Sequence, residues 1–174
     1  MELTNMRPEK TDYDPYYERY ISLVDGDDPI APLSTQVNQL RDLLDGQSED
    51  RGSHAYAEGK WTIKELLSHL IDGERIFAYR ALRISRGDET PIEGFEQDGY
   101  IENSHANERS FADLLDEFEM LRKANLSQFR ILNDSDWSRT GMANNVSVSV
   151  RALAFIMAGH VAHHVNILRE RYLS

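Results

Sequence analysis

An apolar helical pattern with histidines in its middle, in residues 147–173, constrains this chain more than any other feature. At about 100° per residue on a helical wheel, four apolar side chains fall within about 60° of these histidines: Leu153, Ile156, Met157 and Ile167. His160 and His164 are one helical turn apart and project from the same side. A neutral imidazole without a partner is costly in a protein core. The pattern therefore predicts a buried helix face that holds either satisfied core histidines or two ligands of one divalent metal.

A second segment with helical periodicity, residues 62–86, carries a third histidine on its apolar face. Thr62 and Glu65 have the spacing of a capping box, which marks the start of a helix. Gly73 stands one turn beyond His69 on the same face. A glycine inside a helix costs about 1 kcal/mol relative to alanine, so this position predicts a need for space. That space would serve either close helix packing or an open coordination position.

Together these histidines predict a metal site of the catalytic type. His69, His160 and His164 would supply three nitrogen ligands and leave a fourth position open, whereas structural zinc sites are usually closed by four protein ligands. The alternative is that all three are ordinary core histidines. His54 and His105 lie in polar, turn-rich stretches and are expected at the surface.

Three residues beside the expected ligands are candidates for a catalytic role. Asp72 and Glu74 follow His69 closely and could orient an imidazole or move a proton, and Asp72 is the better placed of the two. A solvated surface charge is the simpler interpretation of Asp72. His163 lies at the edge of the apolar stripe, where it could hydrogen-bond a substrate.

The pattern of apolar residues predicts an all-α fold with a single domain over residues 1–174. The amphipathic segments are residues 34–45 with Ser34 as a cap, 62–86, 110–132 and 147–173, with a short helix after Asp14. The loop over residues 87–107 is too long for a simple hairpin and predicts a four-helix bundle with a long crossover connection. Its aromatic residues, Phe95 and Tyr100, are expected to pack against the bundle rather than form a lid.

Two stretches outside these helices carry weaker expectations. Residues 1–12 are polar and are expected to be frayed. Residues 137–148 form a linker in which Gly141, Asn144 and Asn145 allow a short hairpin.

The amino-acid composition limits the cellular compartment and the binding partners that we expect for this protein. The chain has no cysteine, so a thiolate ligand or a cysteine nucleophile is excluded and any sulfur chemistry must use an exogenous thiol. We find no basic leader followed by an apolar run and no stretch long enough to span a membrane, which favours a cytoplasmic protein. The net charge of −11 disfavours nucleic acid and anionic membranes and leaves a small-molecule substrate as the expected partner.

Two motifs resemble the DinB-like, or YfiT-like, family of metalloenzymes. They are WTIKELLSHLIDGE at residues 61–74 and HVAHHVNIL at residues 160–168, and the resemblance extends from about Leu33 onward. It implies a four-helix bundle in which His69, His160 and His164 bind a divalent metal, commonly nickel or zinc. Asn166 and Ile167 replace a glycine-glutamine pair that often follows the last histidine in the family. This departure leaves the ligands intact and the identity of any thiol open.

The resemblance also implies an order of functional hypotheses. Some family members join low-molecular-weight thiols such as bacillithiol, mycothiol or glutathione to electrophiles, and others isomerise maleylpyruvate with a thiol cofactor. We therefore expect a metal-dependent thiol S-transferase reaction first. Metal-dependent hydrolysis is the second hypothesis, and a metal-binding stress-response protein without turnover is the third. A homodimer is plausible for such bundles, although no sequence feature specifies it.

Overall fold

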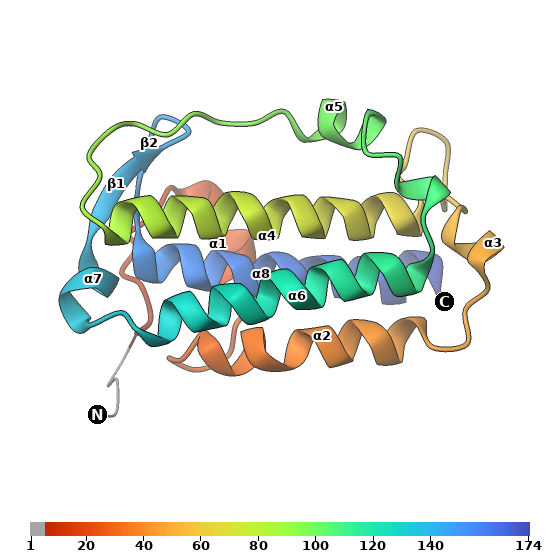
Figure 1. Ribbon diagram of the computed structural model, residues 1–174, viewed down its shortest axis with the longest axis horizontal. Coiled ribbons are helices and arrows are strands. Elements are labelled where there is room, and N and C mark those ends of the chain that lie inside the picture. Colours follow the sequence, from red (N-terminus) through yellow and green to blue (C-terminus); the bar gives the residue numbers. More distant parts are fainter. Residues whose placement is uncertain (1–5) are drawn as a thin grey trace.

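The computed structural model describes residues 6–174, in which four long helices form a bundle (Figure 1). This confirms the expected all-α four-helix architecture. The long helices are α2 (Ile30–Leu44), α4 (Ile63–Ser85), α6 (Phe111–Arg130) and α8 (Val150–Ile167). The shorter helical elements are η1 (Pro15–Tyr17), α1 (Glu18–Ile21), α3 (Glu49–Gly52), α5 (Gln97–Glu102), η2 (Ala106–Glu108), α7 (Asp134–Ser138) and the π-helical turn η3 (Leu168–Tyr172).

The connection between α4 and α6 is the expected crossover. Figure 1 shows α4 and α6 running in the same direction, so residues 86–110 return along the length of the bundle before α6 begins. This connection carries α5 and lies over α4. It is fastened to the hairpin at its start, because the backbone N–H of Ile92 donates to the carbonyl of Met142 at 2.9 Å. The crossover therefore covers one side of α4.

The predicted hairpin in the linker is present and is formed by β1 (Thr140–Ala143) and β2 (Val146–Ser149). The strands are antiparallel, with Ala143 paired to Val146 across a two-residue turn. Asn144 and Asn145 adopt φ values of 54° and 63°, the left-handed region that a tight hairpin turn requires and that asparagine tolerates. The hairpin delivers the chain to Ser149, whose hydroxyl accepts a hydrogen bond from the Ala152 N–H and caps α8.

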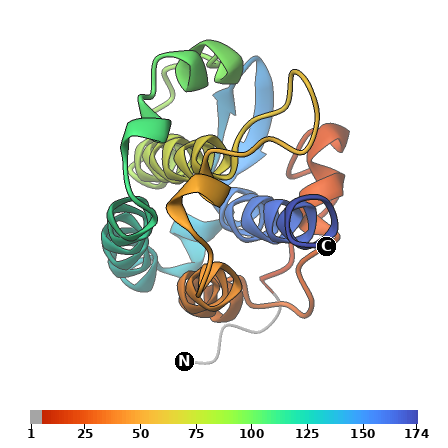
Figure 2. The same ribbon diagram turned by 90° about the vertical axis from the view of Figure 1, so that its right-hand side faces the viewer.

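Helix α8 is the central element of the molecule. Seen along the bundle in Figure 2, it lies among α1, α2 and α4. Its residues are buried nearly all round the helix from Val150 to Val165, whereas the sequence pattern predicted one apolar stripe. The additional cover comes from α1, which packs closely because residue 159 is glycine. A β-carbon at Gly159 would lie 2.0 Å from the carbonyl oxygen of Tyr20.

The apolar core consists of two clusters, one towards each end of the bundle, separated by a polar layer. On α8 one cluster ends at Ala158 and the other begins at Val161. On α4 they are separated between Ile71 and Phe77, and on α6 between Phe118 and Leu126. The buried polar residues of this middle layer are Gln36, Glu74, Arg122, Asn125 and His160. A layer of buried polar side chains thus crosses the bundle between the two apolar clusters.

Local capping explains where the helices begin. At α4, the hydroxyl of Thr62 accepts from the Glu65 N–H while the Glu65 carboxylate accepts from the Thr62 N–H, which confirms the predicted capping box. At α2 the expectation of a Ser34 cap was wrong, since the helix begins at Ile30. There the carboxylate of Asp28 accepts from the Ile30 N–H at 2.8 Å. Pro29 and Pro32 are tolerated at this end because the first backbone N–H groups of a helix have no partner within the helix.

The N-terminal segment is more tightly held than expected from its polarity. Residues 1–5 lie outside the described residues, but Met6 is buried in the core. The Arg7 guanidinium donates to the carbonyls of Val24 and Gly26 at 2.9 Å each. The carbonyl of Asp12 accepts from the Ser149 N–H. Residues 6–12 thus differ from the frayed end that we predicted, because their backbone and Arg7 find partners on distant segments.

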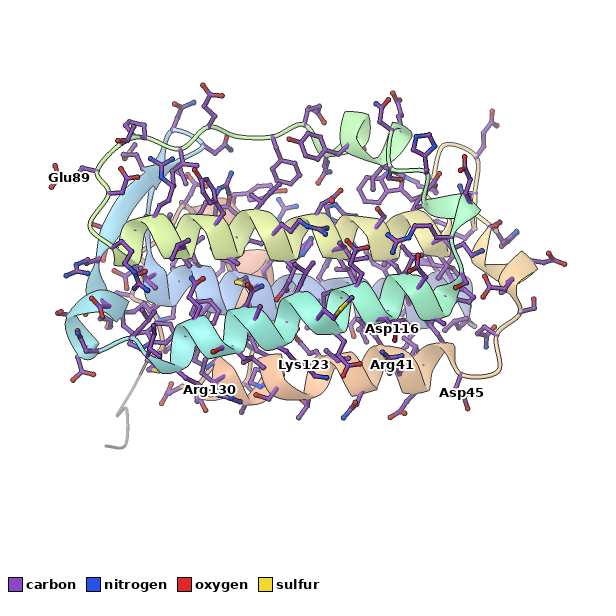
Figure 3. The ribbon with its side chains drawn as sticks, viewed as in Figure 1. Arg41, Asp45, Glu89, Asp116, Lys123 and Arg130 are labelled. Carbon is purple, nitrogen blue, oxygen red and sulfur yellow. The ribbon has the colours of Figure 1, made fainter. Side chains whose placement is uncertain are left out.

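Outside the buried residues described above, charged side chains pair across the surfaces of neighbouring helices. Arg41 of α2 contacts Asp116 of α6 at 2.6 Å, on the face shown in Figure 3. Within residues 6–174, no helix combines the length and the hydrophobicity that crossing a membrane requires.

Candidate metal centre

Three buried histidines meet in the middle of the bundle. His69 comes from α4, and His160 and His164 come from α8. One ligand nitrogen from each lies within 4.8 Å of the others, and the Nε2 atoms of His69 and His160 are 2.8 Å apart. The ring centroids are separated by 4.7 to 4.9 Å. The structure therefore brings together the three residues that were predicted as metal ligands.

The glycine on α4 provides the space that this meeting needs. A β-carbon at Gly73 would lie 3.0 Å from Cε1 and 3.2 Å from Nδ1 of His160. The space expected beside His69 is thus filled by the imidazole of His160 itself. Gly73 allows α4 and α8 to approach until their histidines touch.

Burial keeps the three imidazoles neutral. It lowers the pKa of His69 to about 4, an effect that the Asp98 carboxylate opposes and His163 reinforces. It also holds the pKa values of His160 and His164 well below 6.5, and the positive charges of the neighbouring histidines would lower them further. At neutral pH each ring therefore presents an unprotonated nitrogen, the form that binds a metal.

The donor set fits a divalent transition metal. All three donors are imidazole nitrogens, which suit zinc, nickel, copper and iron. Nδ1 of His164 is buried and has no hydrogen-bond partner, and the contact between His69 and His160 can use only one proton. At least one buried imidazole nitrogen of this group thus has no hydrogen-bond partner. An unsatisfied buried polar atom is costly, so an ion is a physically reasonable occupant.

Two hollows reach the three histidines from different sides. The first, of about 380 Å³, reaches His69 and His160 and is bounded by α1, α4, the hairpin and the start of the crossover. The second, of about 330 Å³, reaches His164 past Trp61, Asp98 and Tyr172. Each hollow therefore borders a different part of the group of three histidines.

The other predicted residues lie outside the group of three. His163 is half-buried, with its ring 5.1 Å from that of His164 and 5.5 Å from that of Tyr20. Asp72 lines a separate hollow with Arg75, where burial raises the pKa of its carboxyl group. Among residues 6–174 we find no contact between Asp72 and an imidazole. The catalytic roles of Asp72 and His163 stay predictions.

Glu74, the third candidate, is committed elsewhere. Its carboxylate is buried and accepts from Arg122 Nε at 2.7 Å and from Arg122 Nη2 at 2.9 Å. It accepts a further hydrogen bond from Asn125 at 3.0 Å. Glu74 therefore joins α4 to α6 rather than serving the histidines. His54 and His105 are exposed, as predicted.

Several residues around the histidines were not identified from the sequence. Tyr20 lies edge-on to His160 with ring centroids 5.4 Å apart, and Trp61 lies 4.8 Å from the ring of His69. Phe95 was expected only to anchor the crossover, but it forms part of the wall of the first hollow. Arg80 also lines that hollow. Tyr20 and Phe95 reach the site through α1 and the crossover, whereas Trp61 lies just before α4 and Arg80 within it, where the sequence pattern gave them no separate role.

Comparison with known proteins assigns the chain to a family. The sequence profile of the DinB superfamily matches residues 33–168. The chain belongs to the DinB superfamily. This confirms the resemblance carried by the two histidine motifs, and His69, His160 and His164 all lie within the matched region.

Individual relatives of this DinB protein are distant. A protein of Oceanobacillus iheyensis named "Putative metal-dependent hydrolase OB0413" is 27% identical over 70 residues. That match covers 40% of each chain, so the DinB protein spans less than half of this curated relative.

Two solved structures share the fold. YfiT from Bacillus subtilis, described as a probable metal-dependent hydrolase with an unusual four-helix bundle topology, matches with a TM-score of 0.74 and 15% identity over 97% of this chain and 92% of YfiT. A mycothiol-dependent maleylpyruvate isomerase matches with a TM-score of 0.65 and 16% identity over 79% of this chain and 58% of that enzyme. At these identities the likeness establishes the fold alone.

Proposed function

We propose that this DinB protein is a divalent-metal-dependent enzyme that joins an exogenous low-molecular-weight thiol to a small electrophile. His69, His160 and His164 would hold the metal, with nickel or zinc as the candidates from the family resemblance. The observation that carries the proposal is the meeting of three buried, neutral imidazoles at a point that two separate hollows reach.

The two hollows favour a reaction between two substrates. Water needs no dedicated hollow of several hundred cubic ångströms, whereas a thiol and an electrophile each need room beside the ligands. The chain has no cysteine, so the thiol would come from solution. The mycothiol-dependent isomerase with a related fold supports thiol chemistry on such a bundle.

The protein's own residues would position the reactants and exclude water. A divalent ion bound by three neutral imidazoles keeps its double charge and lowers the pKa of a thiol or water molecule that it binds. The rings of Tyr20 and Trp61 cover His160 and His69 and would keep water from the reacting sulfur. In the net reaction a carbon–sulfur bond forms, the bond between that carbon and its leaving group breaks, and the thiol proton is released. Asp98, which lines the second hollow, would receive that proton.

Metal-dependent hydrolysis is the second candidate. It is supported by the names of the Oceanobacillus protein and of YfiT, both described as metal-dependent hydrolases. In that reaction water would take the place of the thiol, and the first hollow alone would hold the substrate. The two candidates differ in whether turnover requires a thiol.

Turnover with and without thiol distinguishes these functions. We would load the tag-free protein with nickel or zinc and follow monochlorobimane with bacillithiol, mycothiol or glutathione, and separately a nitrophenyl ester without thiol. We expect thiol-dependent loss of the bimane, abolished in His69→Ala and retained in His54→Ala, whose imidazole is exposed and lies outside the group of three. Ester cleavage without thiol, lost in the same variant, would replace the transferase assignment by hydrolysis. A metal-loaded protein that turns over neither probe would contradict both.

A further inference from the structure

The first hollow contains a buried arginine that no carboxylate neutralises. Arg80 of α4 is 3% exposed and lines the same hollow as His69 and His160. Within residues 6–174 no carboxylate oxygen lies within salt-bridge distance of Arg80, and its Nε has no hydrogen-bond partner. Its Nη2 makes one long hydrogen bond, 3.3 Å, to the carbonyl of Glu93. A buried guanidinium left in this state is costly, which indicates a role for its free donors.

The surroundings of Arg80 suit an anion with an apolar body. The guanidinium lies beside the ring of Phe77 and interacts with the hydroxyl of Tyr17, and Phe95 lines the same hollow. Two carboxylates also face this hollow, those of Asp14 and Glu96. Each is engaged by a backbone N–H, from Tyr16 at 2.9 Å and from Asp98 at 3.2 Å respectively. Among residues 6–174, neither carboxylate lies within salt-bridge distance of Arg80.

Arg80 lies within the length of a small molecule from the histidines. Its guanidinium carbon is 5.8 Å from the centre of the Phe77 ring, and the His160 ring centre is 5.7 Å from the same point. Phe77 thus forms the wall between a cationic end and an imidazole end of one hollow. A ligand that touches both ends would lie along the ring of Phe77.

We propose that Arg80 binds the carboxylate of a small organic acid whose other end lies at the histidines. A guanidinium presents a planar fork of donors that matches a carboxylate through two parallel hydrogen bonds. The charge of −11 on the whole chain repels anions at long range, so a buried cation inside the hollow is the element that would select one. The chemistry at the end of the acid that lies near the histidines rests on the proposed function. The binding of its carboxylate by Arg80 does not depend on that function.

Benzoate is a suitable probe, with benzamide as the uncharged analogue of the same shape. Binding is measured by calorimetry or ligand-observed NMR in the full chain and in His164→Ala, so that binding to a metal ion is separated from binding to Arg80. We expect benzoate to bind both proteins, and Arg80→Gln to weaken benzoate by at least about tenfold while benzamide is unaffected. Arg75→Gln, a change on the exposed side of the same helix, should leave benzoate binding unchanged.

Three results would overturn the proposal. The first is benzoate binding that survives Arg80→Gln, and the second is benzoate binding no stronger than that of benzamide in the unmodified protein. The third uses Arg80→Met, which keeps the apolar stem and removes the charge. If Arg80 is held for a ligand, this variant should melt no lower than the unmodified protein, whereas a clear fall in melting temperature would assign Arg80 a structural role.

Failure of this inference and failure of the proposed function are distinguishable. Loss of turnover with carboxylate binding intact would remove the thiol chemistry and leave the Arg80 site standing. Turnover without selective binding of benzoate would remove the Arg80 site and leave the thiol chemistry standing.

Discussion

Two groups of buried polar side chains lie in and next to the polar layer of the bundle, and they differ in whether every buried nitrogen has a hydrogen-bond partner. In the paired group, Arg122 donates to both carboxylate oxygens of Glu74, to the Leu33 carbonyl at 2.8 Å and to Gln36 at 3.0 Å. The open group comprises the three histidines and Arg80. Nδ1 of His164 and Nε of Arg80 have no partner there.

The complete hydrogen bonds of the paired group fit a role in stability, whereas the unpaired atoms of the open group fit the ligand binding that we propose. Three buried side-chain atoms lack partners in the part of the chain that the structure describes, and two of them belong to the open group. The third, the indole nitrogen of Trp137, lies in the apolar core, where its ring stacks on Phe129. A completed network joins α2, α4 and α6, whereas an incomplete one next to a hollow is costly to the empty protein and available to a bound molecule.

Breaking the paired group should have the largest effect on stability. In Glu74→Gln the charge of Arg122 stays buried without its counter-ion, and we expect the free energy of unfolding to fall by about 3–5 kcal/mol. Urea denaturation measures this change. Lys123→Ala is the matched control, because Lys123 is 72% exposed beside Glu119 and such pairs contribute about 0.5 kcal/mol or less (Figure 3). Equal effects of the two substitutions would contradict the distinction between the groups.

Acid should destabilise the metal-free protein through the open group. The pKa of His69 is about 4 in the folded chain and about 6.5 when unfolded, so below pH 6.5 the unfolded chain binds protons that the folded chain does not. Stability is therefore full above pH 6.5 and is lost as the pH falls towards 4, by about 1.4 kcal/mol per unit for each such histidine. His160 and His164 act in the same direction.

Denaturation at pH 7 and at pH 5.5 tests this sign. A variant that combines His69→Gln, His160→Gln and His164→Gln should lose much less stability over this interval than the unmodified protein. His54→Gln, at an exposed position, should behave like the unmodified protein. Stability that rises on acidification would show that the histidines are not held neutral.

Filling the space between α4 and α8 should have a smaller effect, which we expect on metal binding by the histidines more than on stability. In Gly73→Ala the added methyl group would press on the His160 ring, so we expect metal affinity to fall by about tenfold, as for other residues that orient a ligand. Helix propensity offsets part of any loss of stability, by about 1 kcal/mol. Competition with a chromophoric chelator measures the affinity. Gly99→Ala on α5, where an added β-carbon meets nothing within 4 Å, should leave it unchanged.

The sequence was sufficient for the features that depend on local pattern. Helical periodicity placed His69, His160 and His164 on buried faces, and the Thr62 capping box marked the start of α4. The start of α2 was misplaced because Asp28 and the prolines near it act before Ser34 does. An earlier polar residue such as Asp28 must therefore be weighed against Ser34 when the start of a helix is predicted from the sequence.

The rest of the site depends on how distant segments pack, which no local pattern records. Arg80 resembles any charged residue of an amphipathic helix until the hairpin and the crossover enclose it. Asp98 and Phe95 reach the site only because the crossover runs back over α4. The pairing of Glu74 with Arg122 likewise joins residues 48 positions apart in sequence. These contacts follow from the topology of the bundle.

The most direct test of the account is the metal content of tag-free protein, measured by elemental analysis in the unmodified chain, in His164→Ala and in His163→Ala. We expect about one divalent ion per chain in the unmodified protein and in His163→Ala, and almost none in His164→Ala. Equal metal in all three proteins, or an unmodified protein that takes up no divalent ion when dialysed against nickel or zinc, would contradict it.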